Sequence, residues 1–319
     1  MQHVRISSLL IGLFIGFAVA MTLTLFYHKM NVVNQIKFIK HHDEAGCGFG
    51  GGVTIDRSGR RHFVTMIQQE MFLLDKNHYI PMLNTTKRVW IDVGSHATSF
   101  LGDAKINRRT YWPNHSFKTL SDEFKFSEDL FVIAIDPNVK VHADLSKIPR
   151  LISIIAAIFS TEGTQLFYEY GGEGCSSLLK PNRNFDHAFS SYTWFKPCTE
   201  VKETTGTSTI RLESIISLIN PRYEIELLKI DAQGVDLEVV KSAGKHLKRI
   251  RKIILETQDE VMKNGSSNIL YKDANTAKLT KEWMEDNGYV FNKEQSDIEN
   301  ESISEYNHVY DRSDSIHET

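Results

Sequence analysis

The sequence predicts an α/β fold with a doubly wound, mostly parallel sheet, preceded by an N-terminal transmembrane helix. Several short runs of β-branched and aromatic residues lack the alternation of half-exposed strands, which is typical of strands covered on both faces. A helix with one apolar face lies between two of these runs, and this order builds a right-handed parallel unit. With 319 residues, of which 41% are hydrophobic, the chain can bury one large core.

The expected elements of the body follow one another along the chain. The strands are Arg88 to Val93, Phe131 to Ile135, Leu151 to Phe159, Leu166 to Tyr170, Ile225 to Ile230 and Ile253 to Glu256. The crossover helix runs from Val235 to Leu247, and other helices are expected at 65–74 and from Asp273 to Asp286. Residues 289–291 and 308–310 are expected to pair as strands, with an acidic solvated loop between them.

The first part of the chain is expected to tether this body to a membrane. After a short tail, residues 1–5, no charge occurs from Ile6 to Tyr27, a run long enough to cross a bilayer as a signal-anchor. A cleaved secretory signal is the alternative, because Ala18-Val19-Ala20 has the small residues that signal peptidase accepts. The glycine-rich residues 28–61 are expected to form a stem, and residues 62–319 the folded domain.

Four N-glycosylation acceptor sequences favour a lumenal body, although such tripeptides also arise by chance. They begin at Asn84, Asn114, Asn264 and Asn300. The expected protein is therefore a single-pass type II membrane protein of the Golgi or endoplasmic reticulum, or a secreted protein if the signal is cleaved. In that oxidising compartment Cys175 and Cys198 are the cysteines to test as a disulfide, because both lie in the same central stretch.

Charge and motifs exclude several classes of function. The net charge of -3, from 37 basic and 40 acidic residues, gives no cationic surplus for nucleic acid. The sequence has no C-x-x-C pair, H-E-x-x-H, G-x-S-x-G or P-loop pattern. A zinc site, a zinc protease, a serine hydrolase and a nucleoside triphosphatase are therefore not expected.

Polar residues end four of the expected strands, where ligands of open parallel sheets bind. These ends are Asp92-Val93-Gly94-Ser95-His96, Asp136-Pro137-Asn138, Lys229-Ile230-Asp231 and Glu256-Thr257-Gln258. Gly94 lets a cofactor approach the backbone, and Asp136 can accept hydrogen bonds from ribose hydroxyls. The dinucleotide pattern G-x-G-x-x-G is absent, so phosphate binding is not supported.

The order of these segments resembles the FkbM-type family of S-adenosylmethionine-dependent methyltransferases. The resemblance covers about Val89 to Thr257 and rests on VWIDVGSHATSF, VIAIDPN, IIAAIFSTEGTQLFYEY, GEGCSSLL, ELLKIDAQGVDLEVVKSAG and IILETQD. The fifth segment is the most specific, since it is similar to the family's signature around a Lys-x-Asp strand end. The resemblance implies a Rossmann-like domain of the class I methyltransferase type that binds S-adenosyl-L-methionine.

The resemblance also implies roles for individual positions. It places Asp92, Gly94, Ser95 and His96 in the cofactor turn, Asp136 at the ribose, Ala157 and Ile158 near the adenine, Lys229 and Asp231 at the methyl-transfer face, and Asp236 after the signature glycine, Gly234. His96 and Thr98 stand where the family usually has Asn and a second Gly. Thr98 adds a side chain where the backbone normally passes close to the cofactor. Three outcomes are expected as alternatives: the loop differs from that of the family, the affinity for the cofactor is lower, or the site is degenerate.

The candidate catalytic residues are Asp231, Lys229 and Glu256, and each has a structural alternative. Asp231 is the candidate base, or it caps the helix that begins near Gly234. Lys229 orients the acceptor, or its amine only extends to solvent. Glu256 binds the acceptor or a metal, or it pairs with Lys229 across adjacent strands.

The expected function is methyl transfer to a sugar or glycan hydroxyl in the secretory pathway. An aromatic stretch around His187 can line such an acceptor pocket, or it packs as a lid on the sheet edge. A degenerate methyltransferase fold that acts as a binding module is a second hypothesis, based on His96 and Thr98. A type II membrane glycosyltransferase is a third, but it predicts two aspartates one residue apart at a strand end, a pattern not found there.

Overall fold

The computed structural model describes residues 52–55, 61–64, 74–75, 77–95, 127–145, 148, 150–172, 174–185, 193–300 and 304–314. All of them fall in the compact unit Gly50–Thr319. The expected tail, the anchor at 6–27 and the helix at 65–74 lie outside or almost outside these residues, as do His96, Thr98 and His187. Within the described ranges, no helix is both long and apolar enough to span a membrane.

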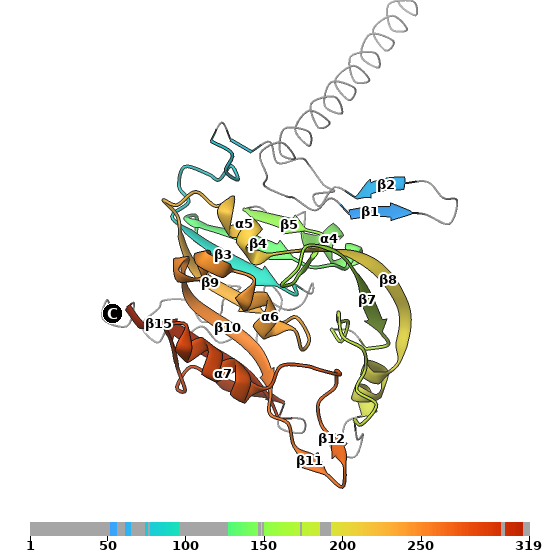
Figure 1. Ribbon diagram of the computed structural model, residues 1–319. Coiled ribbons are helices and arrows are strands. Elements are labelled where there is room, and N and C mark those ends of the chain that lie inside the picture. Colours follow the sequence, from blue (N-terminus) through green and yellow to red (C-terminus); the bar gives the residue numbers. More distant parts are fainter. Residues whose placement is uncertain are drawn as a thin grey trace, which may run out of the picture. The chain divides into compact units, whose positions relative to one another are not determined.

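The central sheet is mixed, with one reversed strand among parallel ones (Figure 1). Five parallel neighbours are β5 (Leu151–Ile154), β4 (Leu130–Ile135), β3 (Arg88–Val93), β9 (Glu224–Ile230) and β10 (Ile250–Gln258). β15 (Glu305–Arg312) follows β10 and runs antiparallel to it, to β13 (Tyr289–Phe291) and to β14 (Asp297–Asn300). The expected mostly parallel α/β sheet is confirmed, with an antiparallel strand near one edge.

The described helices are α4 (Val139–Leu145), α5 (Leu212–Ser217), α6 (Asp236–Lys241) and α7 (Ala277–Asp286), with 3-10 segments η2 (Thr193–Thr199) and η3 (Gly244–Arg249). They include two expected helices, α6 and α7, and two that the sequence analysis missed, α4 and α5. The Thr276 side chain caps α7 by accepting a hydrogen bond from the Leu279 amide. α7 ends at Asn287-Gly288, as expected, where Gly288 takes a φ of 84°.

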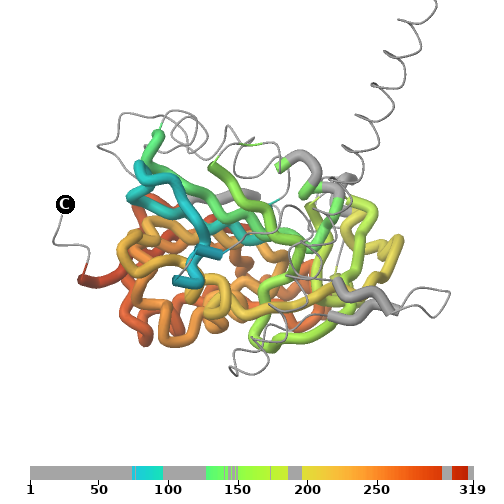
Figure 2. Tube along the Cα trace, turned by 90° about the horizontal axis from the view of Figure 1, so that it is seen from above, coloured from blue at the N-terminus to red at the C-terminus, as the bar shows by residue number. Residues whose placement is uncertain are grey.

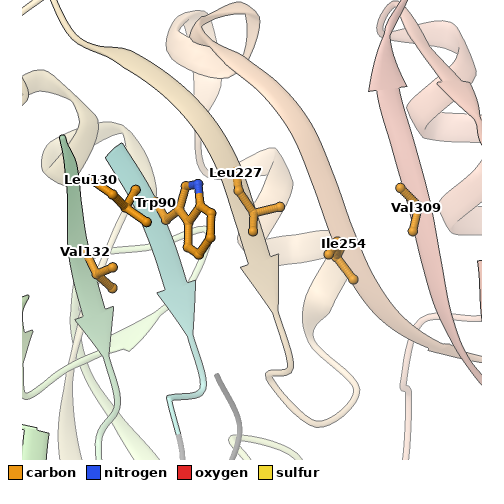
Figure 3. Packing of buried hydrophobic residues seen from close by; sticks show 6 residues of the cluster. All are labelled: Trp90, Leu130, Val132, Leu227, Ile254 and Val309. Atoms are coloured by element: carbon orange, nitrogen blue, oxygen red, sulfur yellow. The ribbon is translucent and has the colours of Figure 1, made fainter. Parts of the chain in front are cut away.

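A row of apolar side chains crosses the sheet and forms a core cluster (Figure 3). It consists of Leu130 and Val132 on β4, Trp90 on β3, Leu227 on β9, Ile254 on β10 and Val309 on β15. Trp90 Nε1 donates a 2.7 Å hydrogen bond to Oε2 of the buried Glu226, and Arg88 Nη1 donates to the same oxygen at 2.9 Å. Because these buried polar groups are hydrogen-bonded, their burial does not destabilise β3, the strand that leads to Gly94.

A second, smaller sheet lies beside the carboxyl ends of β4 and β5. The small sheet has the order β6 (Ala157–Ile158), β8 (Val201–Ile210), β7 (Gly163–Tyr170), and its segment of chain stands to one side of the main sheet in Figures 1 and 2. A disulfide joins Cys175 to Cys198, as the sequence predicts. It lies in an apolar cluster with Tyr170, Phe185, Leu270 and Tyr271.

The structure corrects several expected boundaries. The expected strand from Leu151 to Phe159 divides after Ile154, because the chain leaves the main sheet there and pairs with β8 instead. The expected helix from Val235 to Leu247 ends at Lys241, and Gly244, with a φ of 52°, begins a 3-10 turn. β8 is a strand that the sequence analysis missed.

Two segments expected to be irregular contain short paired strands. β1 (Gly52–Ile55) pairs with β2 (Arg61–Val64) inside or next to the expected stem. β14 occupies part of the expected acidic loop and pairs with β15. A two-residue pair, β11 (Met262–Lys263) with β12 (Ser266–Ser267), forms a hairpin after β10.

Candidate functional site

The candidate site lies where the strand order reverses. From β3 the chain builds outward through β4 to β5, and it later builds through β9 to β10 on the other side of β3. Crevices at such a point, beyond the carboxyl ends of the strands, are where open α/β sheets bind ligands. Gly94 follows β3 here with a φ of 78°, and a Cβ on it would lie 1.8 Å from the carbonyl oxygen of Asp231. Only glycine fits this turn.

A cavity of about 430 Å³ opens beside this turn. Three of its walls come from the main sheet: the ends of β3 and β4, and the loop after β9. The fourth comes from the small sheet and the loop after β7. The lining residues are Val93, Gly94, Ile135, Asp136, Pro137, Asn138, Val141, Ala156, Ala157, Ile158, Phe167, Glu169, Tyr170, Gly171, Gly172, Gly174, Ser176, Ser177, Leu178, Asp231, Ala232, Gln233 and Val235. Its size is that of a cofactor or small-ligand site.

Asp136 lines the cavity and directly follows β4. Its Oδ1 accepts a 2.7 Å hydrogen bond from the Asn138 amide, which fixes the turn. Burial raises the pKa of Asp136 to about 7, and the nearby charges of Asp92 and Asp231 act in the same direction. Ala157 and Ile158 line the same cavity, so three residues assigned from the resemblance to the ribose and adenine lie together.

Asp92 and Ser95 lie beside the cavity but do not line it. Ser95 donates to the Asp92 carbonyl oxygen at 2.7 Å and accepts from the Ile135 amide at 3.2 Å, which ties the ends of β3 and β4 together. Asp92 is 1% exposed, and its Oδ1 has no hydrogen-bond partner among the described residues. Burial raises the pKa of Asp92 to about 6. The buried Asp92 carboxyl group therefore acts on the cavity through its charge and not through contact with a ligand.

Asp231 faces the cavity from the end of β9. The buried ammonium of Lys229 lies 3.4 Å from its Oδ2, and Gln233 Nε2 donates to its Oδ1 at 2.7 Å. Burial by itself raises the pKa of Asp231, but Lys229 and the hydrogen bonds outweigh burial and lower it below its ordinary value. The Lys229 side chain is 5% exposed, so its amine is directed to Asp231 and not to solvent.

The loop after Asp231 is held by the signature acid, Asp236. One of its oxygens accepts from the Ala232 amide at 3.0 Å and the other from the Gly234 amide at 3.1 Å. Asp236, and not Asp231, therefore binds the backbone at the start of α6, so the alternative of Asp231 as a helix cap is wrong. Asp236 is 2% exposed and does not line the cavity.

Gln233 connects the candidate catalytic residues, and the sequence analysis missed it. Its Nε2 donates to Asp231 Oδ1 and, at 2.8 Å, to Glu256 Oε2. Its Oε1 lies 2.6 Å from the hydroxyl of Tyr271, which is 3% exposed. Gln233 lines the cavity, whereas Lys229 and Glu256 do not. A glutamine directly before the signature glycine was the only indication of this role in the sequence.

The structure thus brings Gly94, Asp136, Ala157, Ile158 and Asp231 around one cavity. Asp92, Ser95, Lys229 and Glu256 support its walls from behind. His96 falls outside the described residues. In the part of the chain that is described, no group of three or more His, Cys, Asp or Glu residues is arranged to hold a metal ion.

Comparisons with known proteins agree with the placement of these segments. The model of the methyltransferase FkbM domain matches residues 92–291. No curated protein matches the sequence. A solved structure described as the crystal structure of small RNA methyltransferase HEN1 is similar over 71% of this chain and 23% of that chain, with 10% sequence identity and a TM-score of 0.28. At that TM-score the likeness carries no argument about function.

Proposed function

The chain belongs to the FkbM methyltransferase family, and from this premise we propose that it transfers a methyl group from S-adenosylmethionine to an oxygen acceptor, a sugar or glycan hydroxyl. The observation that carries this proposal is the cavity at the strand reversal, which both Asp136 and Asp231 line. The first residue suits a ribose, and the second suits an acceptor hydroxyl that must lose a proton.

The residues present fit this cofactor. Asp136 has one oxygen committed to Asn138 and the other available to ribose hydroxyls. The described lining contains the carboxylates of Asp136, Glu169 and Asp231 and no Lys, Arg or His. Such a lining favours a cation, and S-adenosylmethionine when bound would supply a methyl group on a positively charged sulfur.

Asp231 is the group proposed to take the acceptor's proton. Its low pKa keeps it ionised at neutral pH, and its position on the cavity wall gives it access to a bound hydroxyl. Lys229 holds the carboxylate from behind and limits its orientation. The chain's own contribution is therefore orientation and proton transfer, which is the larger part of what methyl transfer requires of a protein.

Calorimetry of the full chain with S-adenosylhomocysteine tests cofactor binding. We expect saturable binding by the wild type, and loss of binding in Gly94→Val, where a side chain would meet the Asp231 backbone. Gly265→Val is a matched control, because Gly265 also has a positive φ but nothing within 4 Å of an added Cβ. A folded wild type that gives no heat and no thermal shift would contradict the proposal and favour the binding-module hypothesis.

We further propose that the domain works in the lumen of the Golgi or endoplasmic reticulum, held by the apolar run at 6–27. The Cys175–Cys198 disulfide supports an oxidising compartment. The acceptor asparagines Asn84 and Asn264 are exposed, and Asn264 lies at the tip of the β11–β12 hairpin. Expression in a secretory host should give a glycosidase-sensitive mobility shift that Asn84→Gln and Asn264→Gln reduce; an unglycosylated chain with both cysteines reduced would contradict this location.

A further inference from the structure

Gln233 has a backbone conformation that is unfavourable for a residue with a side chain. Its φ is 54°, in the left-handed region, and it directly precedes Gly234, whose φ is 93°. A residue with a side chain in this region costs about 1 kcal/mol or more, so it persists where the surrounding contacts fix it. Such residues cluster at functional sites, and Gln233 lies on the cavity wall next to Asp231.

The contacts of Gln233 use every polar group of its side chain. The two hydrogens of Nε2 go to two carboxylates, Asp231 Oδ1 at 2.7 Å and Glu256 Oε2 at 2.8 Å. Oε1 faces the Tyr271 hydroxyl at 2.6 Å. Its backbone oxygen accepts from Ser177 Oγ at 2.7 Å. The amide therefore joins the ends of β9 and β10 to the loop after β7 and to residue 271.

The orientation of the amide is determined by these partners. A flipped amide would place Oε1 against two carboxylate oxygens, which when ionised have no hydrogen to give it. Burial and the charge of Glu256 raise the pKa of Tyr271 well above its ordinary value, so this hydroxyl keeps its proton throughout the neutral range. Its one hydrogen has two acceptors within reach, Gln233 Oε1 at 2.6 Å and the Cys175 carbonyl oxygen at 2.8 Å, so the two carboxylates contribute more than Tyr271 to orienting the amide.

Two neighbouring carboxylates repel each other. Without a donor group between them, they are expected to retain one shared proton. The NH2 group offers each carboxylate a hydrogen bond, which is a contact that favours the ionised form. We propose that Gln233 is a positioning residue that holds the carboxylate of Asp231 beside Glu256 and in its ionised form, so that Asp231 can accept the hydroxyl proton of the acceptor. This inference rests on the proposed function.

The proton balance makes the role specific. As the acceptor oxygen bonds to the methyl carbon, the bond between that carbon and sulfur breaks and its electron pair stays on sulfur. The hydroxyl proton goes to Asp231. If Gln233 were itself a carboxyl group, the cluster would already hold that proton near neutral pH, and Asp231 would be a poorer acceptor.

Gln233→Glu tests this directly, because it keeps the size of the side chain and removes the donors. We expect the acid limb of the kcat profile to move up by about one pH unit or more. The Tm of this variant should also fall further below the wild-type Tm between about pH 5 and pH 8. The reason is that a third carboxylate with a raised pKa destabilises the fold as pH rises. Gln165→Glu is the matched control, since the Gln165 side chain on β7 donates to Thr161 Oγ1 at an exposed position and does not line the cavity.

Gln233→Ala separates positioning from ligand contact. We expect kcat to fall about 10²-fold while the affinity for S-adenosylhomocysteine stays within about threefold. If Gln233→Glu does not fold, Tyr271→Phe, which frees the amide to turn, should give a smaller loss of kcat with the same retained affinity.

Two results would overturn the inference. One is a Gln233→Glu variant whose dependence of kcat on pH and dependence of Tm on pH both coincide with those of Gln165→Glu. The other is a Gln233→Ala variant that loses product binding but keeps kcat, which would make Gln233 a ligand contact. If the wild type binds no S-adenosylhomocysteine, the proposed function fails, but the Tm curves still report whether Gln233 keeps Asp231 ionised.

Discussion

Two carboxylates that line the same cavity have pKa values moved in opposite directions. Asp136 has burial without a cation, which raises its pKa to about 7, whereas Asp231 has burial with Lys229 and Gln233, which lowers its pKa. At neutral pH one group is close to half protonated and the other is ionised. The lowered pKa keeps Asp231 in the unprotonated form that a proton acceptor needs, although it also makes the carboxylate a weaker base.

The first prediction concerns Asp231. Asp231→Asn should lower kcat by about 10²-fold or more, because the amide cannot accept the proton, while the affinity for S-adenosylhomocysteine changes little. Steady-state kinetics and calorimetry measure the two effects. Asp129→Asn is the control, since it also removes a carboxylate from an ion pair, with Arg88, at the opposite end of β3. Equal losses of kcat in the two variants would contradict a role in proton transfer.

The second prediction concerns Asp136 and pH. Its folded pKa is above its unfolded value, so it weakens the fold as pH rises from about 4 to about 7, and this penalty then stays constant. Asp136→Asn should therefore raise the Tm of the ligand-free protein at pH 8 by about 2–4 °C and leave it unchanged at pH 4. The same variant should lose affinity for S-adenosylhomocysteine. A Tm gain of equal size at both pH values would contradict the assignment.

At the scale of elements, the strands buried on both faces were predictable and the small sheet was not. β3, β4 and β9 are short apolar runs, so their sequence shows their burial directly. β8 reads VKETTGTSTI, and only its second half is buried, so no run of apolar residues indicates it. The strand at 151–159 divided because sequence shows the hydrophobicity of a run but not the point where it leaves one sheet for another.

The candidate site was predictable in the same uneven way. Asp92, Asp136 and Asp231 follow recognisable strands, so their common edge of the sheet could be inferred. Gln233 could not, because its role depends on Tyr271, which is distant in sequence and is brought near by the chain after β10. A side chain whose partners lie in a loop has no periodic pattern that reports it.

The disulfide supports the cavity wall made by the loop after β7. A Cβ on Gly172, a lining residue, would lie within 2.7 Å of Cys198 Sγ and 2.9 Å of Cys175 Sγ, and the Cys175 carbonyl accepts from Tyr271. The bond closes a loop with a sequence separation of 23, for which the stabilisation is about 3 kcal/mol.

The third prediction follows from that contact. Cys175→Ser/Cys198→Ser should lower Tm and also weaken binding of S-adenosylhomocysteine, because the Gly171–Ser177 wall loses its support. Scanning calorimetry and titration measure both effects, with dithiothreitol on the wild type as an independent route to the same state. Dithiothreitol should leave the double variant unchanged. A lower Tm with full affinity would show that the bond stabilises the fold without shaping the cavity.

At the scale of the whole molecule, family membership, the cavity and the fold agree on a methyltransferase-type domain. The match from 92 to 291 spans the strand reversal and the crossover helix, and it ends within β13. β15 lies beyond the matched residues, yet it completes the sheet between β10 and β13.

The fourth prediction concerns this last strand. A chain that stops before Glu305 removes β15, so β10 and β13 lose their common partner and β10 becomes an unpaired edge. We expect such a chain to aggregate, which size-exclusion chromatography and light scattering would show. A chain that stops after Asp314 keeps the whole strand and should remain monodisperse. A soluble, cooperatively unfolding chain without β15 would contradict this role.

The position of β15 also bears on how the protein folds. β10 and β13 precede their shared neighbour along the chain, so a partly folded chain in which β15 has not yet paired has open edges on both strands. The pairing of β15 with β13 spans few residues and its pairing with β10 spans more, and long-range pairing is slow. A folding intermediate without this pairing is therefore exposed to edge-to-edge association with other chains.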